Sequence, residues 1–232
     1  MGFNEKIFGE LLNLFKTILR SIDYDYEFVE LIHESNIIDH LIKEFNEIYF
    51  FYLDTNNKIL LILIEIFYFI SKDRKSIKML MNSQLPATIN NMINSIEPMT
   101  ISLFSEKMFE FCIVIISSFL KTKTCAKIFY VNYTNLIEKI KTILMEYKYI
   151  NSKENLKSKI VVFFQLVIEY ENNDKNLMTR LLTKTYFKDL KLKNPHSTLT
   201  FENLIEKTLS YIENPEATYD RSRLSRVSIM FI

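Results

Sequence analysis

Glycine is nearly missing from this chain of 232 residues, which holds only Gly2 and Gly9, together with four prolines. The tight turns of strand-rich folds and the loops that cradle phosphates both depend on glycine. A chain with no glycine after position 9 is therefore expected to be helical. We predict an all-α fold.

Other absences narrow the function. Cys112 and Cys125 lie in different segments, so they form no disulfide framework. The formal charge is only +1, from 29 basic and 28 acidic side chains. A nucleic-acid surface usually shows as a basic excess, so binding to nucleic acid is not expected. The nucleophile-elbow, P-loop and zincin motifs are all missing, so we expect no enzyme activity and no cofactor.

No pattern in the chain indicates a membrane span. The first twenty residues mix charged and apolar side chains, unlike a secretory signal with its unbroken apolar centre. Residues 59–70 form a strongly apolar run, but a span needs about 20 apolar residues. We expect a soluble protein in the cytoplasm, with the nucleus as the alternative location.

Three apolar segments dominate what is present, at residues 59–70, 108–120 and 160–168. The first of them carries a single charge, on Glu65. A helix that is apolar nearly all round must be buried on most of its sides. We interpret the three segments as the inner helices of a stacked helical repeat.

The expected helices recur at a period near 50 residues. The apolar segments end at Ile70, Phe119 and Ile168, with separations of 49 and 49. Short helices are expected to begin around Phe28, Ile77, Ile128 and Leu177, with separations of 49, 51 and 49. Amphipathic helices are expected to begin around Ile37, Leu85, Leu136 and Tyr186, with separations of 48, 51 and 50. Such periods are typical of repeat architectures, and chance recurrence in an apolar chain is the alternative.

Polar residues mark the expected joins between these helices. Ser76 is a candidate N-cap for the short helix that bears Ile77. Pro86 falls near the first position of the next helix, where a missing N–H costs nothing.

Residues 28–42 show the unit best, and residues 125–140 show it second best. A short helix, a polar join and an amphipathic helix, followed by a buried helix, resemble an armadillo or HEAT-type repeat. The resemblance covers residues 1–192 and implies a right-handed α-solenoid of about four repeats. The glycine common between the first two helices of such repeats is absent, and the period exceeds their usual length of about 40 residues. Residues 193–232 are expected to form a C-terminal helix and a tail.

In armadillo-like stacks the third helix of each repeat lines a concave groove. The resemblance therefore implies that polar residues interrupting the buried helices face a protein partner. The alternatives are a solvated edge or an internal hydrogen bond. The residues concerned are Glu65, Ser117, Ser118, Gln165, Glu169 and Tyr170.

Other chemistry-bearing residues have simpler explanations. His33 and His40 could share a metal ion, but the polar join between them breaks the helical face, so surface histidines are favoured. The pair Glu169 and Glu171 could serve acid–base chemistry, yet a charged helix face explains it more simply. In the basic tail, Ser225 and Ser228 lie in a pattern that resembles the substrate of a basophilic kinase.

We therefore expect a non-enzymatic scaffold or adaptor that binds a segment of a protein partner along the groove of a helical-repeat stack. One alternative is a structural or regulatory subunit of a larger assembly. Another is a compact bundle, resembling apoptosis inhibitors, that binds an amphipathic helix.

Overall fold

The structure is a computed structural model that describes residues 2–21, 26–51, 58–96, 103–146, 154–173, 180–193 and 199–213. Within these residues all regular structure is helical and no strand occurs, as the scarcity of glycine predicts. The described helices are α1 (Gly2–Ser21), α2 (Tyr26–Glu34), α3 (Ile37–Phe51), α4 (Lys58–Ile70), α5 (Arg74–Asn82), α6 (Leu85–Asn94), α7 (Leu103–Leu120), α8 (Lys123–Asn132), α9 (Thr134–Glu146), α10 (Glu154–Asn173), α11 (Lys184–Lys193) and α12 (Leu199–Glu213).

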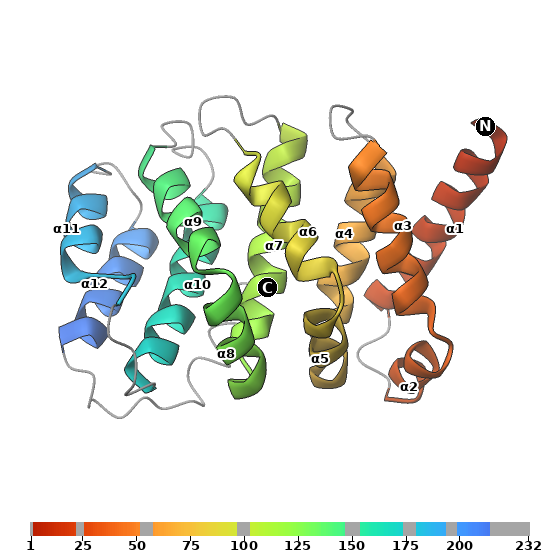
Figure 1. The fold of residues 1–232 in the computed structure, drawn as a ribbon. Coiled ribbons are helices and arrows are strands. Elements are labelled where there is room, and N and C mark those ends of the chain that lie inside the picture. Colours follow the sequence, from red (N-terminus) through yellow and green to blue (C-terminus); the bar gives the residue numbers. More distant parts are fainter. Residues whose placement is uncertain are drawn as a thin grey trace.

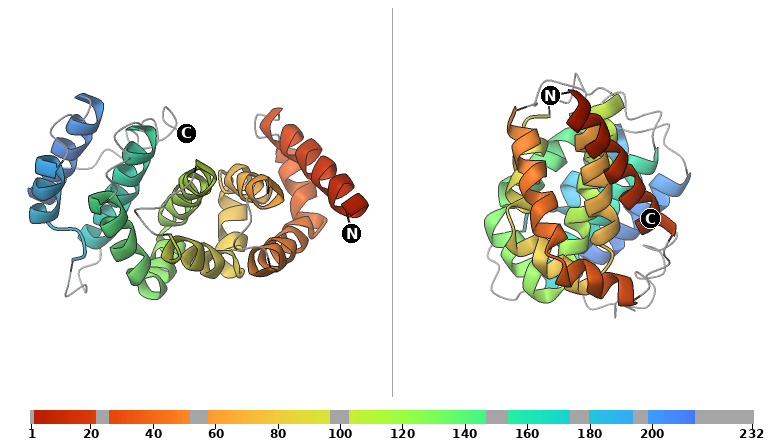
Figure 2. Two further views of the ribbon diagram at one scale, coloured as in Figure 1. Left: turned by 90° about the horizontal axis from the view of Figure 1, so that it is seen from above. Right: turned by 90° about the vertical axis from the view of Figure 1, so that its right-hand side faces the viewer.

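The helices lie in two layers (Figure 1). In the first, α1, α4, α7, α10 and α12 contact one another in succession. In the second, α3 contacts α6 and α6 contacts α9, while the short helices α2, α5 and α8 lie at the lower edge of Figure 1. Seen from above, the molecule curves so that α1, α4, α7 and α10 are on the inside of the curve (Figure 2). We call the layer of α1, α4, α7, α10 and α12 the inner layer.

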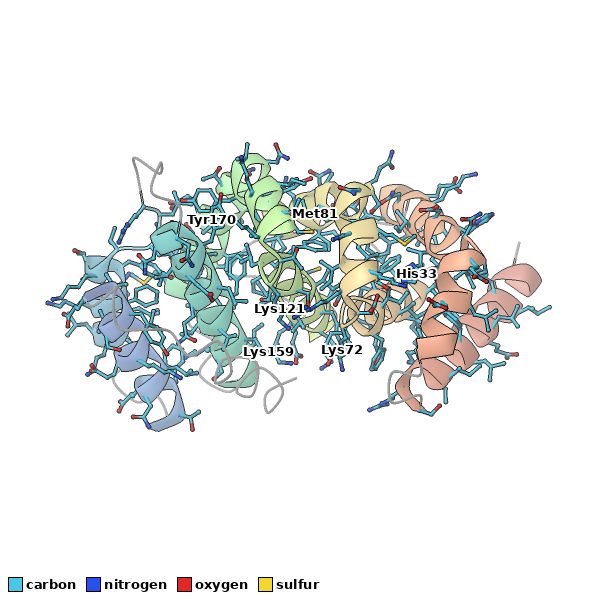
Figure 3. All side chains as sticks on the ribbon, turned by 90° about the horizontal axis from the view of Figure 1, so that it is seen from below. His33, Lys72, Met81, Lys121, Lys159 and Tyr170 are labelled. Atoms are coloured by element: carbon cyan, nitrogen blue, oxygen red, sulfur yellow. The ribbon has the colours of Figure 1, made fainter. Side chains whose placement is uncertain are left out.

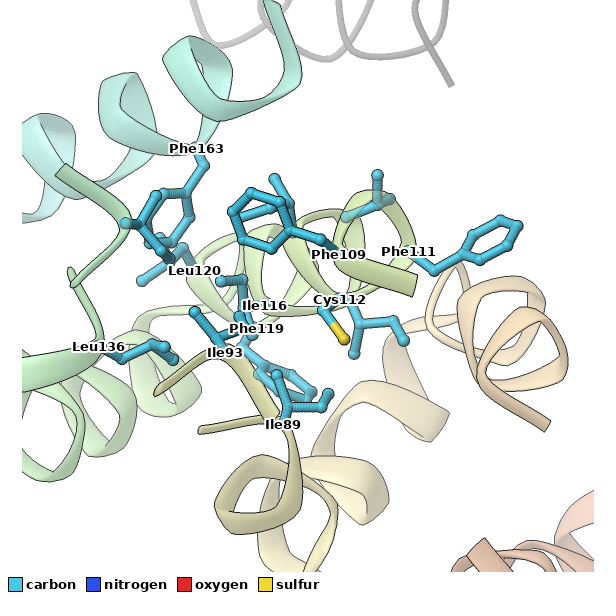
Figure 4. Close-up of a cluster of buried hydrophobic side chains, with 14 of the residues drawn as sticks. Ile89, Ile93, Phe109, Phe111, Cys112, Ile116, Phe119, Leu120, Leu136 and Phe163 are labelled. Atoms are coloured by element: carbon cyan, nitrogen blue, oxygen red, sulfur yellow. The ribbon is translucent and has the colours of Figure 1, made fainter. Parts of the chain in front are cut away.

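The core is built on the apolar segments that the sequence indicates. These segments lie in α4, α7 and α10, and their terminal residues Ile70, Phe119 and Ile168 are all buried, as predicted. Figure 4 shows the cluster around α7, to which α9 contributes Leu136 and α10 contributes Phe163. The central helix of the inner layer is thus surrounded by both layers.

The turn between α2 and α3 is made by an asparagine, Asn36. Asn36 has a φ of 52°, in the left-handed region that glycine adopts most easily and asparagine next. Before it, the N–H of Ser35 donates to the carbonyl of Leu31 at 3.0 Å and closes α2. The next helix then begins at once, at Ile37. Asn36 therefore allows the sharp turn between α2 and α3 without a glycine.

The start of α5 corrects one expectation and confirms another nearby. Asp73, not Ser76, is the N-cap, and the backbone N–H of Ser76 donates to Oδ2 of Asp73 at 2.7 Å. A capping carboxylate accepts from the N–H two or three residues along the chain, and here the cap lies three residues before the N–H that it binds. Ser76 is therefore the third residue of the helix and not its cap. Pro86 lies in the first turn of α6, as predicted.

The described helices after α10 join the same packed structure. α12 packs against α10 and α11, so it extends the inner layer by one helix. The expected fourth short helix around Leu177 lies outside the described residues. The tail with Ser225 and Ser228 also lies outside them.

Candidate partner-binding surface

Two of the six side chains predicted to face a partner are serines buried in α7. The hydroxyl of Ser117 donates to the carbonyl of Ile113 at 2.6 Å, and that of Ser118 donates to Val114 at 3.1 Å. Both serines are buried, and Ser118 is only 2% exposed. Bonds of this kind satisfy a serine inside its own helix. The structure therefore gives both hydroxyls an internal role.

Gln165 is also buried, and it joins α10 to α12. Its Nε2 donates to Oγ1 of Thr208 at 2.9 Å and to the carbonyl of Leu204 at 3.5 Å. Thr208 is itself buried and donates to the same carbonyl at 2.7 Å. A buried amide is costly unless it is hydrogen-bonded. Gln165 is thus a polar link between neighbouring helices of the inner layer.

The other three predicted residues are half-buried and reach the surface. The carboxylate of Glu65 pairs with Lys16 of α1 at 3.3 Å. The ring of Tyr170 lies 5.0 Å from that of Tyr130, centroid to centroid. With Glu169, these are the members of the predicted set that a partner can touch without rearrangement, and their role in binding stays a prediction.

Ser76, His33 and Asp73 bring together the residue types of a hydrolase triad, but in another geometry. Oγ of Ser76 lies 3.1 Å from Nε2 of His33 and donates to Oδ2 of Asp73 at 2.9 Å. In a triad the carboxylate orients the imidazole through its other nitrogen. Here that nitrogen, Nδ1, lies 2.7 Å from Sδ of Met79. The group caps α5 and ties it to α2.

A group of lysines that the sequence reasoning missed lies near the middle of the molecule (Figure 3). We call Lys72, Lys121 and Lys159 the lysine cluster. Lys72 and Lys121 follow the ends of α4 and α7, and Lys159 lies in α10. Lys159 pairs with Glu110 of α7 at 2.6 Å. By contrast, Lys72 and Lys121 form no ion pair with any residue that the structure describes.

The charges of the lysine cluster act on one another. Partial removal of water from the ammonium group, and then the charge of Lys159, lower the pKa of Lys72. Loss of water and the charge of Lys72 lower the pKa of Lys121 in the same way. Both residues still have large exposed surfaces. Like charges held close together are stabilised when an anion arrives between them, so this pair is suited to bind one.

Glu110 limits the positive charge of this region. It lies between Lys107, at 2.8 Å, and Lys159. Partial burial raises the pKa of Glu110, but hydrogen bonds and charges from the two lysines outweigh burial and hold that pKa below its ordinary value. Glu110 is therefore ionised at neutral pH. The uncompensated charge rests on Lys72 and Lys121.

Aromatic rings lie beside Lys72. Nζ of Lys72 is 4.7 Å from the ring centroid of Tyr68 and 5.2 Å from that of Phe69. The ring of Tyr68 lies 5.3 Å from that of Phe111 in α7. A cation over an aromatic face is stabilised by about 0.5–1 kcal/mol at exposed sites. The rings of Tyr68 and Phe69 thus help to hold Lys72 in place, and the half-buried Phe69 offers some apolar surface next to it.

The repeat period is the sequence pattern from which the lysine cluster could have been predicted. Lys72 and Lys121 are 49 residues apart, and Tyr170 follows 49 residues later. This separation equals that of the terminal residues of the buried segments. An exposed lysine is common on any helical protein, so neither lysine stood out without the period.

Glu171, which the sequence predicts to lie on a charged helix face, is instead buried in the structure. This carboxylate is 2% exposed, and its Oε1 accepts from the hydroxyl of Tyr130 and from the N–H of Leu181, both at 2.8 Å. Its Oε2 has no partner among the described residues. Burial raises the pKa of Glu171 above 4.5 in spite of these hydrogen bonds. Its contacts hold the segment before α11 against α8 and α10.

Comparisons with models of known protein families, with curated proteins and with solved structures find no match. None of the described helices has both the length and the apolar character needed to cross a membrane. The described residues also contain no group of three or more His, Cys, Asp or Glu side chains placed to hold a metal ion.

Proposed function

We propose that this chain is a non-enzymatic protein-interaction scaffold, in which armadillo-like repeats stack into a solenoid and bind an acidic partner segment beside the inner layer. The observation that carries the proposal is the pair Lys72 and Lys121. Both lysines are exposed, and neither forms an ion pair with a described residue. Burial and then the charge of Lys72 lower the pKa of Lys121, so the two ammonium groups lie close enough to interact.

The repeat geometry supports an extended partner. Lys72, Lys121 and Tyr170 are spaced by one period each. The two lysines follow α4 and α7, and Tyr170 lies in the last turn of α10. In a stack of repeats, each unit packs on its neighbour in the same way. Equivalent positions of successive units therefore lie in a row. A segment that runs along this row meets one lysine from each of two successive repeats.

The charge pattern favours an acidic peptide over nucleic acid. Nucleic-acid grooves show a continuous basic stripe. Here the carboxylates of Glu65 and Glu110 interrupt the basic residues of the inner layer. A peptide can place acidic side chains at the lysines and an apolar one on the half-buried Phe69, avoiding the two carboxylates.

The test is the affinity of a labelled oligoglutamate peptide, measured by fluorescence anisotropy. The double variant Lys72→Gln/Lys121→Gln should weaken binding about tenfold, because each exposed charge pair contributes about 1 kcal/mol or less. The matched control is Lys127→Gln, which removes an exposed lysine of α8. An equal loss of binding free energy per lysine removed would indicate attraction by net charge alone and would overturn the proposed site.

A second experiment addresses the scaffold itself. Proteins captured from cell extract by the original chain and by the double variant are compared, with Lys127→Gln again as the control. A partner lost only with the double variant, and carrying an acidic segment that binds in isolation, supports the proposal. Partners that bind all three proteins equally would place the interaction elsewhere.

A further inference from the structure

The two ends of the inner layer differ in character. At one end, all the described exposed side chains of α12 are polar: Thr200, Asn203, Glu206, Ser210 and Glu213. At the other end, α1 exposes large apolar side chains, and in the end-on view it lies in front of the rest of its layer (Figure 2). Terminal units of stacked helical proteins generally need a polar outer face for solubility. α12 meets this need, and α1 does not.

The exposed apolar residues of α1 form one stripe. Ile7 is 43% exposed, Leu11 59% and Leu14 58%, and the half-buried Ile18 continues the same face. Their spacing of four, three and four residues keeps them on one side of a helix. A different face of α1, which includes the buried Leu12, packs toward α4 and the core. We call Ile7, Leu11, Leu14 and Ile18 the α1 stripe.

We propose that the α1 stripe is a self-association surface, on which α1 of a second copy of this chain packs in antiparallel orientation. A two-fold axis midway between Leu11 and Leu14 places Leu11 of one copy opposite Leu14 of the other. The same axis places Ile7 opposite Ile18. The stripe therefore reads Ile, Leu, Leu, Ile in both directions. A two-fold interface requires such self-complementarity, because the same patch serves both subunits.

Two other features favour a second copy as the occupant. The net charge of the chain is only +1, so two copies repel each other weakly. The inner layer also already consists of helices packed side by side from α4 to α12. A partner α1 on the stripe continues this packing by one more helix and covers its apolar end. The dimer is independent of the lysine cluster, which lies on other helices.

The first test is the mass of the full chain in solution, measured by sedimentation equilibrium over a range of concentrations. We expect a reversible dimer of twice the 27.7 kDa chain mass. The variant Leu11→Glu/Leu14→Glu should weaken dimerisation at least about a hundredfold, because it buries four like charges at the axis. The control is Val131→Glu, which changes an apolar residue of α8 that is 67% exposed. Helical content of each variant is checked by circular dichroism.

A crosslinking test fixes the orientation without weakening the interface. Leu11→Cys and Leu14→Cys variants are mixed and oxidised, and the native Cys112 and Cys125 are buried. Antiparallel packing predicts a disulfide mainly between the two different variants, whereas parallel packing predicts one within each. A monomer at all concentrations would overturn the proposal. So would a dimer that the double glutamate variant leaves intact, or crosslinks only between identical variants.

Discussion

The carboxylate of Glu171 shows how a single buried group can combine two opposing effects. Its Oε1 accepts two hydrogen bonds, which favour the charged form, but burial outweighs them and raises its pKa. A folded protein with a raised carboxyl pKa holds its proton at pH values where the unfolded chain has released it. Its stability therefore falls as pH rises through this window and is recovered as pH falls toward 4.5.

The pH dependence gives a prediction at this residue. Glu171→Gln keeps an oxygen that can accept from Tyr130 and Leu181 but no longer titrates. Relative to this variant, the original chain should become more stable as pH falls from 7 toward 5. The check is urea unfolding of both proteins at the two pH values. If the original chain instead loses stability relative to Glu171→Gln on acidification, the folded-state pKa of Glu171 is lowered, contrary to the structure.

At the same scale, the sequence indicates which residues interrupt the buried helices but not what they touch. Because Ser118 and Gln165 interrupt apolar segments, the sequence predicts that they face a protein partner. The structure shows both residues buried, with internal hydrogen-bond partners. The partner of Gln165 is Thr208, 43 residues away. Such a pairing depends on how α12 docks on α10, and no local pattern contains that information. Glu171 was hidden for the same reason, because its donors come from α8 and the segment before α11.

At the scale of helices, the apolar pattern predicts most of the architecture. α3 and α6 begin at Ile37 and Leu85, as predicted, because a polar join and an apolar stripe coincide there. The starts of α7 and α10 were predicted several residues too late. Their first turns contain Glu106 and Lys157, which are buried in the structure although charged residues usually mark an exposed end. Charge alone therefore misplaces the start of a helix whose first turn is covered by neighbours.

Phe119 provides the prediction for a whole helix. It is fully buried near the end of α7, with its ring 6.3 Å from that of Phe129 in α8. Phe119→Ala should lower the free energy of unfolding by about 3–5 kcal/mol, through lost transfer energy and an unfilled cavity. Chemical denaturation measures the change. Leu192→Ala, at a residue that is 77% exposed, is the control and should change stability by about 0.5 kcal/mol or less. Similar small losses in both variants would contradict the central packing role of α7.

At the scale of the whole molecule, contacts are mainly between neighbours. The inner layer joins α1 to α12 through successive pairs, and no contact links its two ends among the principal helix pairs of the described structure. A compact bundle instead brings distant helices together around one centre. The two arrangements therefore differ in overall dimensions even though the helices are the same. This difference separates the scaffold from the compact groove-binding alternative.

Solution scattering distinguishes the extended stack of helices from a compact bundle. The protein for the experiment is a chain ending at Glu213 that carries Leu11→Glu/Leu14→Glu, so that neither self-association nor the last 19 residues, 214–232, adds to the size. A compact protein of this length has a radius of gyration of about 17 Å. We expect a clearly larger value, with a pair-distance distribution skewed toward long distances, because the stacked helices extend in one direction. Phe119→Ala in the same background is the control for partial unfolding. If unfolding were the cause of a large radius of gyration, this destabilised variant would be larger still and would have a lower helical content. A symmetric distribution with a radius near 17 Å would contradict the extended arrangement and favour the compact bundle.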